Sequence, residues 1–431
     1  MSTKLDRVAE KARSDHQLRF TSLAHLLTPE FLKETWTKLN KRGAHGVDGE
    51  TAREFEETLE ARLQDLHERL KARRYRAPPV RRTYIPKGQG QSRPLGIPTI
   101  EDRLLQAAVA RILNVLFEPL FVDFSFGYRP KRKAHDALRQ VRRHLMGGRV
   151  MHVYDMDIRA YFERVNHDWL RQMLAKRVAD PVIMSLVGKW LRAGVMDAGV
   201  VITRGDGVPQ GGPVSPILAN VYLHYVLDLW FERAVKPNCQ GEAHLVRFAD
   251  DAVVLFQHRS EAERFDKALK KRLEKFNLEL SPEKTRLIVF GRYARERAVA
   301  RGEKPDTFEF LGFTHVCGKD VKGRFAVIRK PASKSCRKFL DKTRSWLRSH
   351  MHYKVRIQQK QLTRMLTGFY QYFALNHCTA TLYRVRATVR RQWRNTLRRR
   401  SQKGARKARW SHLFEQSWFD LPKPVKLHGN V

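Results

Sequence analysis

Two adjacent aspartates, Asp250 and Asp251, lie between two apolar runs of the sequence. Residues 245–246 precede the pair and residues 253–256 follow it, and this pattern predicts two β-strands joined by a short turn. Neighbouring carboxylates repel each other, and they are costly to place in an apolar hairpin unless a divalent cation compensates their charge. The pair therefore favours a metal-binding site over the alternative, which is a solvent-exposed acidic turn.

A second acidic strand is predicted upstream, over residues 153–158, where two carboxylates alternate with apolar side chains. Asp157 is the second of these carboxylates, and Phe162 follows it five positions later. Such a pair of residues is common by chance when it stands alone. It gains weight here because the acidic hairpin follows it in the chain.

A loop rich in Gly and Pro separates the two acidic segments, over residues 207–216. Gln210 precedes the adjacent glycines Gly211 and Gly212, and two glycines in a row allow a backbone to approach a ligand closely. The Ser-Pro at the end of the loop predicts the start of a helix, which apolar residues continue at three- and four-residue spacing. An ordinary Pro-Gly loop is the alternative.

Residues 84–99 predict two short strands joined by a Gly-rich turn, with Lys87 before the turn and Arg93 after it. Arg offers a planar fork to phosphate oxygens and Lys offers a compact charge, so the two cations suit the binding of a triphosphate. Taken alone, the pattern is also typical of a solvated hairpin.

These segments, in this order, resemble motifs of the group II intron-encoded reverse transcriptases, which are also called intron maturases. The acidic strand with Phe162 resembles motif A, the Gly-Pro loop resembles motif B, and the acidic hairpin resembles motif C. Phe248 departs from the family pattern, in which Tyr is commoner, and Phe369 stands where Trp is commoner. Further blocks resemble the family's extra N-terminal block, the block after the fingers, motif D, the primer-grip hairpin and the thumb helix: residues 43–49, 125–130, 281–285, 308–313 and 366–373.

The resemblance implies an RNA-directed DNA polymerase that uses two Mg²⁺ ions, for which Mn²⁺ is a possible substitute. One ion would lower the pKa of the primer 3′-hydroxyl, and the other would hold the triphosphate and neutralise the leaving pyrophosphate. Asp155 does not meet the spacing of motif A, so we interpret it as structural. Asp251 is a weaker candidate ligand than Asp250, because the second carboxylate of such a pair can serve mainly to set the local field and the hairpin geometry.

The resemblance also implies the roles of individual residues. Phe162 would lie under the sugar and discriminate against a ribose 2′-hydroxyl. The catalytic residues would be Asp157, Asp250 and Asp251, and the metal ligands would be Asp157, Ile158, Asp250 and Asp251. The residues expected to bind the nucleotide are Lys87, Arg93, Phe162, Gln210, Gly211 and Lys284.

A formal net charge of +40 on 431 residues points to a polyanionic partner, and nucleic acid is the first candidate. No Asp or Glu occurs between Asp341 and Glu415, so the positive charge is concentrated in the C-terminal quarter. Apolar residues there recur at helical spacing: Leu382, Val385, Val389, Trp393 and Leu397. We expect Arg384 and Arg386 around the rest of this helix and a nucleic-acid contact face at Arg384, Arg390, Arg391, Arg394 and Arg398; a disordered basic tail is the alternative.

Four cysteines are scattered through the chain without a Cys-x-x-Cys pair: Cys239, Cys317, Cys336 and Cys378. The sequence therefore predicts neither a zinc site nor a disulfide framework, and a reducing cytoplasm fits. Many intron-encoded relatives carry a zinc-assisted HNH endonuclease domain, whose ligand set is not expected here. Because no apolar run has the length of a transmembrane helix and no signal-peptide core is seen, we expect a bacterial cytoplasmic ribonucleoprotein with no membrane contact.

We expect an α+β right-hand polymerase fold, with an antiparallel palm sheet, a helical N-terminal extension and an α-helical thumb. The C-terminal tail is expected to be mobile until it meets RNA. The expected segments are the N-terminal extension with its extra block over residues 1–75, fingers and palm over residues 76–325, a thumb or maturase domain over residues 326–401, and the basic tail over residues 402–431.

The leading interpretation is a group II intron-encoded enzyme that copies RNA into DNA and binds intron RNA to assist splicing and retrohoming. Its partners would be intron RNA, an RNA template with a DNA primer, target DNA and deoxynucleoside triphosphates. A splicing-only maturase is less favoured, because a pure binding protein has no need of three costly carboxylates. An RNA-dependent RNA polymerase is less favoured because of Phe162. A relative recruited to phage defence or DNA repair is the alternative that the sequence leaves open.

Overall fold

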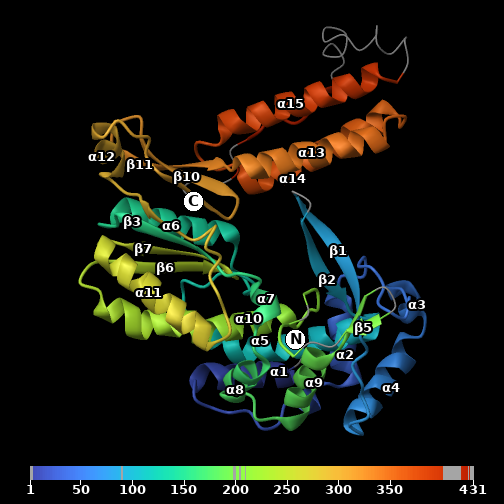
Figure 1. The fold of residues 1–431 in the computed structure, drawn as a ribbon. Helices are drawn as coiled ribbons and strands as arrows, with labels where there is room; N and C mark the ends of the chain where they lie inside the picture. The colour runs from blue at the N-terminus through green and yellow to red at the C-terminus, as the bar shows by residue number, and fades with distance from the viewer. Residues whose placement is uncertain are drawn as a thin grey trace.

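The computed structural model describes residues 3–88, 91–197, 200–202, 205–208, 210–400, 419–425 and 427. Figure 1 shows three groups of elements: a sheet flanked by helices, a long hairpin that rises from a helical base, and a set of helices above both. The sheets are mostly antiparallel and lie among many helices. The α+β right-hand architecture predicted from the sequence is confirmed.

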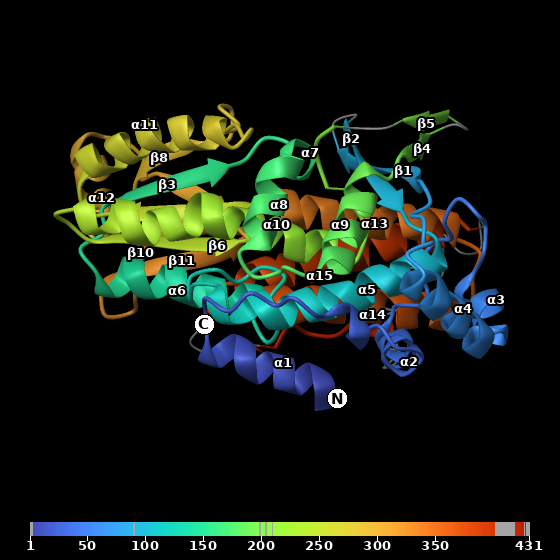
Figure 2. The same cartoon turned by 90° about the horizontal axis from the view of Figure 1, so that it is seen from below.

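The helical base is built around α5 (Ile100–Phe117), which is buried on most of its surface. Thr99 caps this helix, because its hydroxyl accepts a hydrogen bond from the Asp102 N–H at 3.3 Å. The first helices of the chain pack around it, as Figure 2 shows from below. They are α1 (Thr3–Ser14), α2 (Pro29–Lys38), α3 (Ala52–Glu57) and α4 (Leu59–Lys71).

The palm sheet has the strand order β6-β7-β3-β8, and its neighbouring strands run antiparallel. The strands are β3 (His152–Asp157), β6 (Ala243–Phe248), β7 (Asp251–Phe256) and β8 (Arg286–Val289). Side chains of successive residues point to opposite faces, and both faces are covered. Tyr154 and Met156 pack in the core on the side of α11 (Arg259–Lys275), while Val153 packs in the core that includes α6 (Ala134–Gly147).

The fingers hairpin pairs β1 (Val80–Gly88) with β2 (Gln91–Ile97), as the sequence predicts. A second, shorter hairpin of β4 (Val195–Asp197) and β5 (Val200–Ile202) extends this sheet, with β4 parallel to β1. The sheet order is β2-β1-β4-β5. Residues 89–90, which follow β1 in the sequence, lie outside the described part of the chain.

A three-stranded sheet leads to the thumb helices, and its strands are β9 (Thr307–Phe310), β10 (Phe313–Lys319) and β11 (Phe325–Pro331). Leu311 and Gly312 both have positive φ in the turn between β9 and β10, the conformation of a tight hairpin that matches the strand twist. Three helices follow: α13 (Ser333–Ser349), α14 (Val355–Phe373) and α15 (Thr379–Arg398). The apolar stripe that the sequence predicts along α15 is buried over its whole length, so this prediction is confirmed.

The remaining elements connect these groups. The chain runs from the Gly-Pro loop into α10 (Ser215–Leu223), with Pro216 in its first turn, as the sequence predicts. None of the helices in the described part of the chain has the length and apolar character that a bilayer span requires. The connecting elements are η1 (Ala24–Leu26), η2 (Glu118–Leu120), α7 (Tyr161–Arg164), α8 (His167–Ala175), α9 (Pro181–Arg192), the π-helical turns η3 (His224–Asp228) and η4 (Phe231–Val235), η5 (Lys236–Asn238) and α12 (Ala294–Ala300).

The glycines of the Gly-Pro loop are packed against the fingers and the base. Gly211 has a φ of +122°, and a Cβ at this position would lie 2.5 Å from the Gly96 carbonyl oxygen. A Cβ on Gly212 would lie 2.2 Å from Gln106 Oε1. The two glycines therefore have a packing role inside the protein, which the sequence pattern alone did not indicate.

We expect Gly211→Ala to lower the free energy of unfolding by roughly 1–3 kcal/mol, because the new Cβ meets a backbone carbonyl at a left-handed φ. Gly368→Ala is the matched control. Gly368 is exposed within α14 and an added Cβ has nothing within 4 Å, so this change should raise the free energy of unfolding by about 0.5–1 kcal/mol. Urea denaturation measures both, and equal stabilities of the two variants would contradict the packing role.

Candidate active site

The acidic hairpin predicted from the sequence is the junction of β6 and β7. Phe248 pairs with Asp251, so Ala249 and Asp250 form a two-residue turn. Ala249 has a φ of +59°, a left-handed conformation that residues with a Cβ seldom adopt. The turn places Asp250 at the tip of the hairpin and leaves Asp251 on the strand.

The neighbouring strand β3 brings Asp157 to the same place. In the β3–β7 ladder Asp157 stands directly opposite Asp251, and paired residues share one face of the sheet. Ile158 follows Asp157 and its side chain is buried, so its carbonyl is the group that could contact an ion. The structure therefore gathers the three aspartates that the sequence singled out.

Burial, with repulsion from neighbouring carboxylates, raises the pKa values of Asp251 and Asp155 on this face. Burial raises the pKa of Asp251 to about 7, and the negative charges of Asp155 and Asp250 add to this effect, whereas a hydrogen bond from the Leu311 main chain opposes it. Burial also raises the pKa of Asp155 to about 6, against the effect of Arg286, whose Nη2 lies 3.6 Å from Asp155 Oδ2. A cation near this face would relieve the repulsion.

Lys284 supplies one positive charge at the site. Its Nζ lies 2.9 Å from Asp157 Oδ2, and the segment that carries it is fixed by a hydrogen bond of 2.8 Å from the Ser281 N–H to the Asp157 carbonyl. The block that resembles motif D therefore lies beside the strand that resembles motif A. The resemblance implied a place for Lys284 at the nucleotide, and in the structure its side chain pairs with Asp157.

Phe162 lies between the acidic strand and the Gly-Pro loop. Its ring is buried, and its carbonyl accepts a hydrogen bond of 2.7 Å from the Val208 N–H. A pocket beside it is lined by Phe162, Gln210 and Gly96, among others. The structure thus joins Phe162 and the loop to the fingers strand β2, where the Gly96 N–H donates to the Gln210 carbonyl at 2.6 Å.

The two fingers cations are only partly defined. Lys87 lies on β1, and Arg93 lies on β2 opposite Ile85. Their side chains lie outside the described part of the structure, so their expected contact with a triphosphate stays a prediction.

The thumb arginines do not all lie on an open face. Arg384, Arg391 and Arg398 are exposed, and Arg394 is half-buried. Arg390 is also half-buried, with Nη2 3.8 Å from Asp420 Oδ1, and burial lowers its pKa.

The expectation that Arg386 lies on the outer face is wrong. Its side chain is buried, and it donates to the Leu421 carbonyl at 3.0 and 2.8 Å and to Asp420. Phe419 stacks on Trp393 with ring centroids 4.0 Å apart. The expectation of a mobile tail is therefore also wrong for residues 419–425, because this segment packs along α15 and covers one side of it.

Comparison with known proteins identifies the family. A family model described as reverse transcriptase (RNA-dependent DNA polymerase) matches residues 85–315, which contain part of the fingers hairpin and all three aspartates. The chain belongs to this family. The resemblance to group II intron-encoded reverse transcriptases is also confirmed, because relatives named for group II introns and other introns match.

Two of these relatives show how far the similarity extends. The chain is 35% identical to Protein YkfC of Escherichia coli (strain K12) in an alignment of length 281 that covers 58% of this chain and 74% of that protein. It is also 35% identical to the group II intron-encoded protein LtrA of Lactococcus lactis subsp. cremoris in an alignment of length 234 that covers 52% of this chain. The chain spans only 38% of the length of LtrA.

Reverse transcriptases generally use divalent metal ions, and the donor set of this site suits them. Three carboxylates and a backbone carbonyl are hard oxygen ligands of the kind that Mg²⁺ prefers. Within the described residues, however, no three His, Cys, Asp or Glu side chains are already grouped as a metal site. Lys284 pairs with Asp157 instead, while burial and then the charges of Asp155 and Asp250 raise the pKa of Asp251.

Two contacts of the site were missed at the level of sequence. Leu311, in the primer-grip hairpin, donates its main-chain hydrogen bond to Asp251. Arg247 lies buried directly before the acidic turn and contacts the Ala249 carbonyl. A charged residue inside the apolar run 245–248 was a signal for Arg247, whereas no pattern marks the Leu311 contact.

We expect Phe162→Val to admit ribonucleotides, because the smaller side chain opens space beside the sugar. The incorporation ratio of deoxyribonucleotide to ribonucleotide should fall by roughly 10-fold or more, in line with the removal of a steric barrier worth about 1–3 kcal/mol. Tyr161→Phe is the control, since it keeps the neighbouring ring and removes only the hydrogen bond to the Ala219 carbonyl. Single-nucleotide incorporation measures the ratio, and an unchanged ratio in Phe162→Val would place the discrimination elsewhere.

Proposed function

We propose that this chain copies RNA into DNA at the palm face that carries Asp157, Asp250 and Asp251, as part of a group II intron ribonucleoprotein. The observation that supports this most is the register that sets Asp157 opposite Asp251 in a chain of the reverse transcriptase family. The proposed partners are intron RNA, an RNA template with a DNA primer, target DNA and deoxynucleoside triphosphates. Two Mg²⁺ ions, which Mn²⁺ can replace, are the proposed cofactors, and the proposed setting is the bacterial cytoplasm.

Each residue of the site has a separate task in this proposal. Asp157, Asp250 and the Ile158 carbonyl hold the divalent ions, and Asp251 sets the local field from its place against Leu311. When bound, the ions lower the pKa of the primer 3′-hydroxyl and neutralise the leaving pyrophosphate. Lys284 pairs with Asp157, and it would be available to the triphosphate if that carboxylate held metal instead. Phe162 lies beneath the sugar.

Asp250→Asn should reduce RNA-templated primer extension by roughly 10³-fold or more, because an amide cannot replace a carboxylate that holds metal. Binding of structured RNA should stay within about 2-fold, since the change removes no cation that could pair with a phosphate. Asp65→Asn, at an exposed position on α4, is the matched control and should keep full activity. Near-parental extension by Asp250→Asn would overturn the site assignment.

The outer face of α15 is the proposed contact for structured RNA. In Figure 1 this helix is the thumb helix farthest from the palm and the fingers hairpin, and three of its arginines are exposed. Because Asp420 and Leu421 cover Arg386 and partly cover Arg390, the open cations among the candidates are Arg384, Arg391 and Arg398. The N-terminal extension, fingers and palm, thumb and tail boundaries predicted from the sequence are retained as part of this proposal.

Changing Arg384, Arg391 and Arg398 to Gln should weaken binding to intron RNA, and the slope of log affinity against log salt should become shallower by about one unit for each phosphate that is no longer neutralised. Extension of a saturating template-primer should be unchanged. A control with the same change in charge is Lys267, Lys271 and Lys275 to Gln on α11, which lies on the opposite side of the palm sheet from α6. If the two triple variants show the same salt slope, this face of α15 does not bind phosphate.

A further inference from the structure

We propose that Arg247 and Asp228 form a buried positioning pair, which fixes the left-handed Ala249 peptide and thereby aims Asp250. The inference rests on the polymerase site proposed above. It assigns a role to residues behind the acidic turn that do not touch substrate.

The pair is fully enclosed. Both side chains have 0% exposure, and the guanidinium of Arg247 contacts both oxygens of Asp228, at 2.7 Å from Nε and 2.5 Å from Nη2. Arg247 lies on β6 and points toward the α11 side of the sheet, because Leu245, two positions earlier, packs in that core. A bidentate pair of this kind has a fixed geometry.

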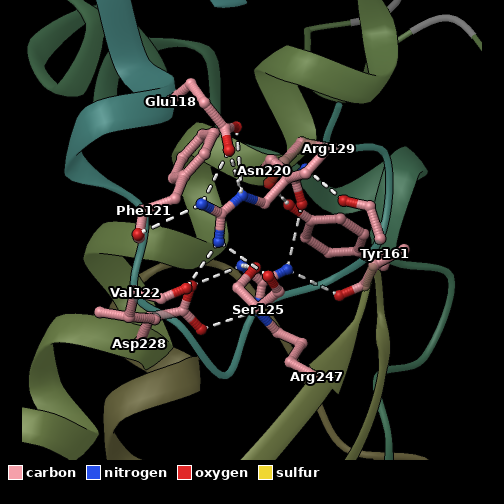
Figure 3. Close-up of polar contacts among 12 residues, drawn as sticks. Glu118, Phe121, Val122, Ser125, Arg129, Tyr161, Asn220, Asp228 and Arg247 are labelled. Atoms are coloured by element: carbon pink, nitrogen blue, oxygen red, sulfur yellow. Dashed lines mark hydrogen bonds and ion pairs between the residues drawn. The ribbon is translucent and has the colours of Figure 1, made fainter. Parts of the chain in front are cut away.

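The other donors of Arg247 reach two separate segments and the catalytic turn. Nη1 donates to the Ala249 carbonyl at 2.9 Å and to Asn220 Oδ1 at 3.1 Å, while Nη2 also donates to Ser125 Oγ at 2.7 Å. With the two bonds to Asp228, all five N–H donors of the guanidinium have acceptors. Figure 3 shows these contacts converging on one side chain.

Each partner of Arg247 is itself held in place. Asn220 donates to the Gly127 carbonyl at 2.7 Å, and Asp228 ends the π-helical turn η3 that continues α10. Arg129 donates to the Ser125 carbonyl at 2.8 Å and pairs with Glu118, as Figure 3 also shows. π-Helical turns are frequent at functional sites because they re-aim side chains. The helix after motif B and the block at residues 125–130 thus both support the acidic turn.

The turn has little freedom to move against these supports. A Cβ on Gly127 would lie 2.2 Å from the Ala249 nitrogen, so this loop runs in contact with the turn. Ala249 keeps a φ of +59° that its Cβ disfavours, and the hydrogen bond from Arg247 to its carbonyl holds the peptide in that orientation. Asp250 is the next residue, so its carboxylate is directed by the same peptide.

A role in stability alone does not require this arrangement. Apolar side chains of similar volume often replace a buried ion pair without reducing stability. They cannot donate to the Ala249 carbonyl. If the pair only stabilises the fold, removing both charges together should leave kcat unchanged. If the pair positions the Ala249 peptide, the same change should lower kcat.

The test replaces the pair by Arg247→Met with Asp228→Leu and measures unfolding, template-primer affinity and single-nucleotide kinetics. We expect a folded protein whose affinity and KM for the nucleotide stay within about 3-fold, while kcat falls on the order of 100-fold, the usual effect of a small misplacement of a catalytic group. A kcat within about 3-fold of the parent would overturn the proposal.

Arg247→Lys keeps the positive charge beside Asp228, and it tests the positioning role if the double variant does not fold. One ammonium cannot serve Asp228, Ser125 and the Ala249 carbonyl together, so kcat should fall by roughly 10-fold, with faster hydrogen exchange over residues 247–252. Parental kcat and exchange in this variant would overturn the proposal.

Arg177→Met is the matched control for removal of a buried arginine. Arg177 is 1% exposed and donates to the carbonyls of Ala12, Asp15 and Leu18, so its replacement should lower stability and leave kcat unchanged.

Asp250→Asn distinguishes failure of the positioning role from failure of the proposed active site. If Asp250→Asn is inactive while the double variant is fully active, only the positioning role fails; if Asp250→Asn is active, the proposed site itself fails.

Discussion

The antiparallel register between β3 and β7 is the constraint on which the site depends. It sets Asp157 opposite Asp251 and brings Asp155 to the same face, so three carboxylates lie close together. A shift of the β3 register by one residue would turn the carboxylates of β3 toward the core on the opposite face of the sheet. That shift is opposed by both cores at once, since Tyr154 and Met156 pack on one side and Val153 on the other. Hydrophobic burial on two faces thus holds together carboxylates that repel each other.

Neighbouring segments compensate this repulsion from different directions. Lys284 neutralises Asp157 from the motif D segment, and Arg286 faces Asp155. The Leu311 main chain contacts Asp251 from the primer-grip hairpin, while the Tyr372 hydroxyl donates to the Leu311 carbonyl at 2.8 Å from the thumb. The thumb is therefore connected to the palm face that carries the aspartates by two hydrogen bonds through one turn residue.

Features that lie within one helix or one hairpin could be predicted from the sequence, because the spacing of apolar residues inside that element indicates them. The acidic hairpin and the α15 stripe follow from spacing of two, three and four residues within one element. The pairing of β3 with β7 joins segments far apart in the chain, and only resemblance to a family indicated that Asp157 and Asp250 meet.

Features that depend on several segments were not predictable in this way. Phe419 and Leu421 belong to a segment too short to show a periodicity, so no pattern marked the residues that pack on α15 and bury Arg386. The packing of Gly211 against Gly96 needs the fingers strand in place. In each case the residue contacts a segment that is distant in the sequence, so the local pattern does not reveal the contact.

The most direct test of the account is the position of the metal ions. Crystals of the protein with an RNA template, a DNA primer and a non-hydrolysable deoxynucleotide, grown with Mn²⁺, would locate the ions by anomalous scattering. The account predicts ions bound between Asp157 and Asp250, with the Ile158 carbonyl as a further ligand and Lys284 displaced from Asp157. Ions bound away from these two aspartates, with the Lys284 ion pair intact beside a bound nucleotide, would contradict it.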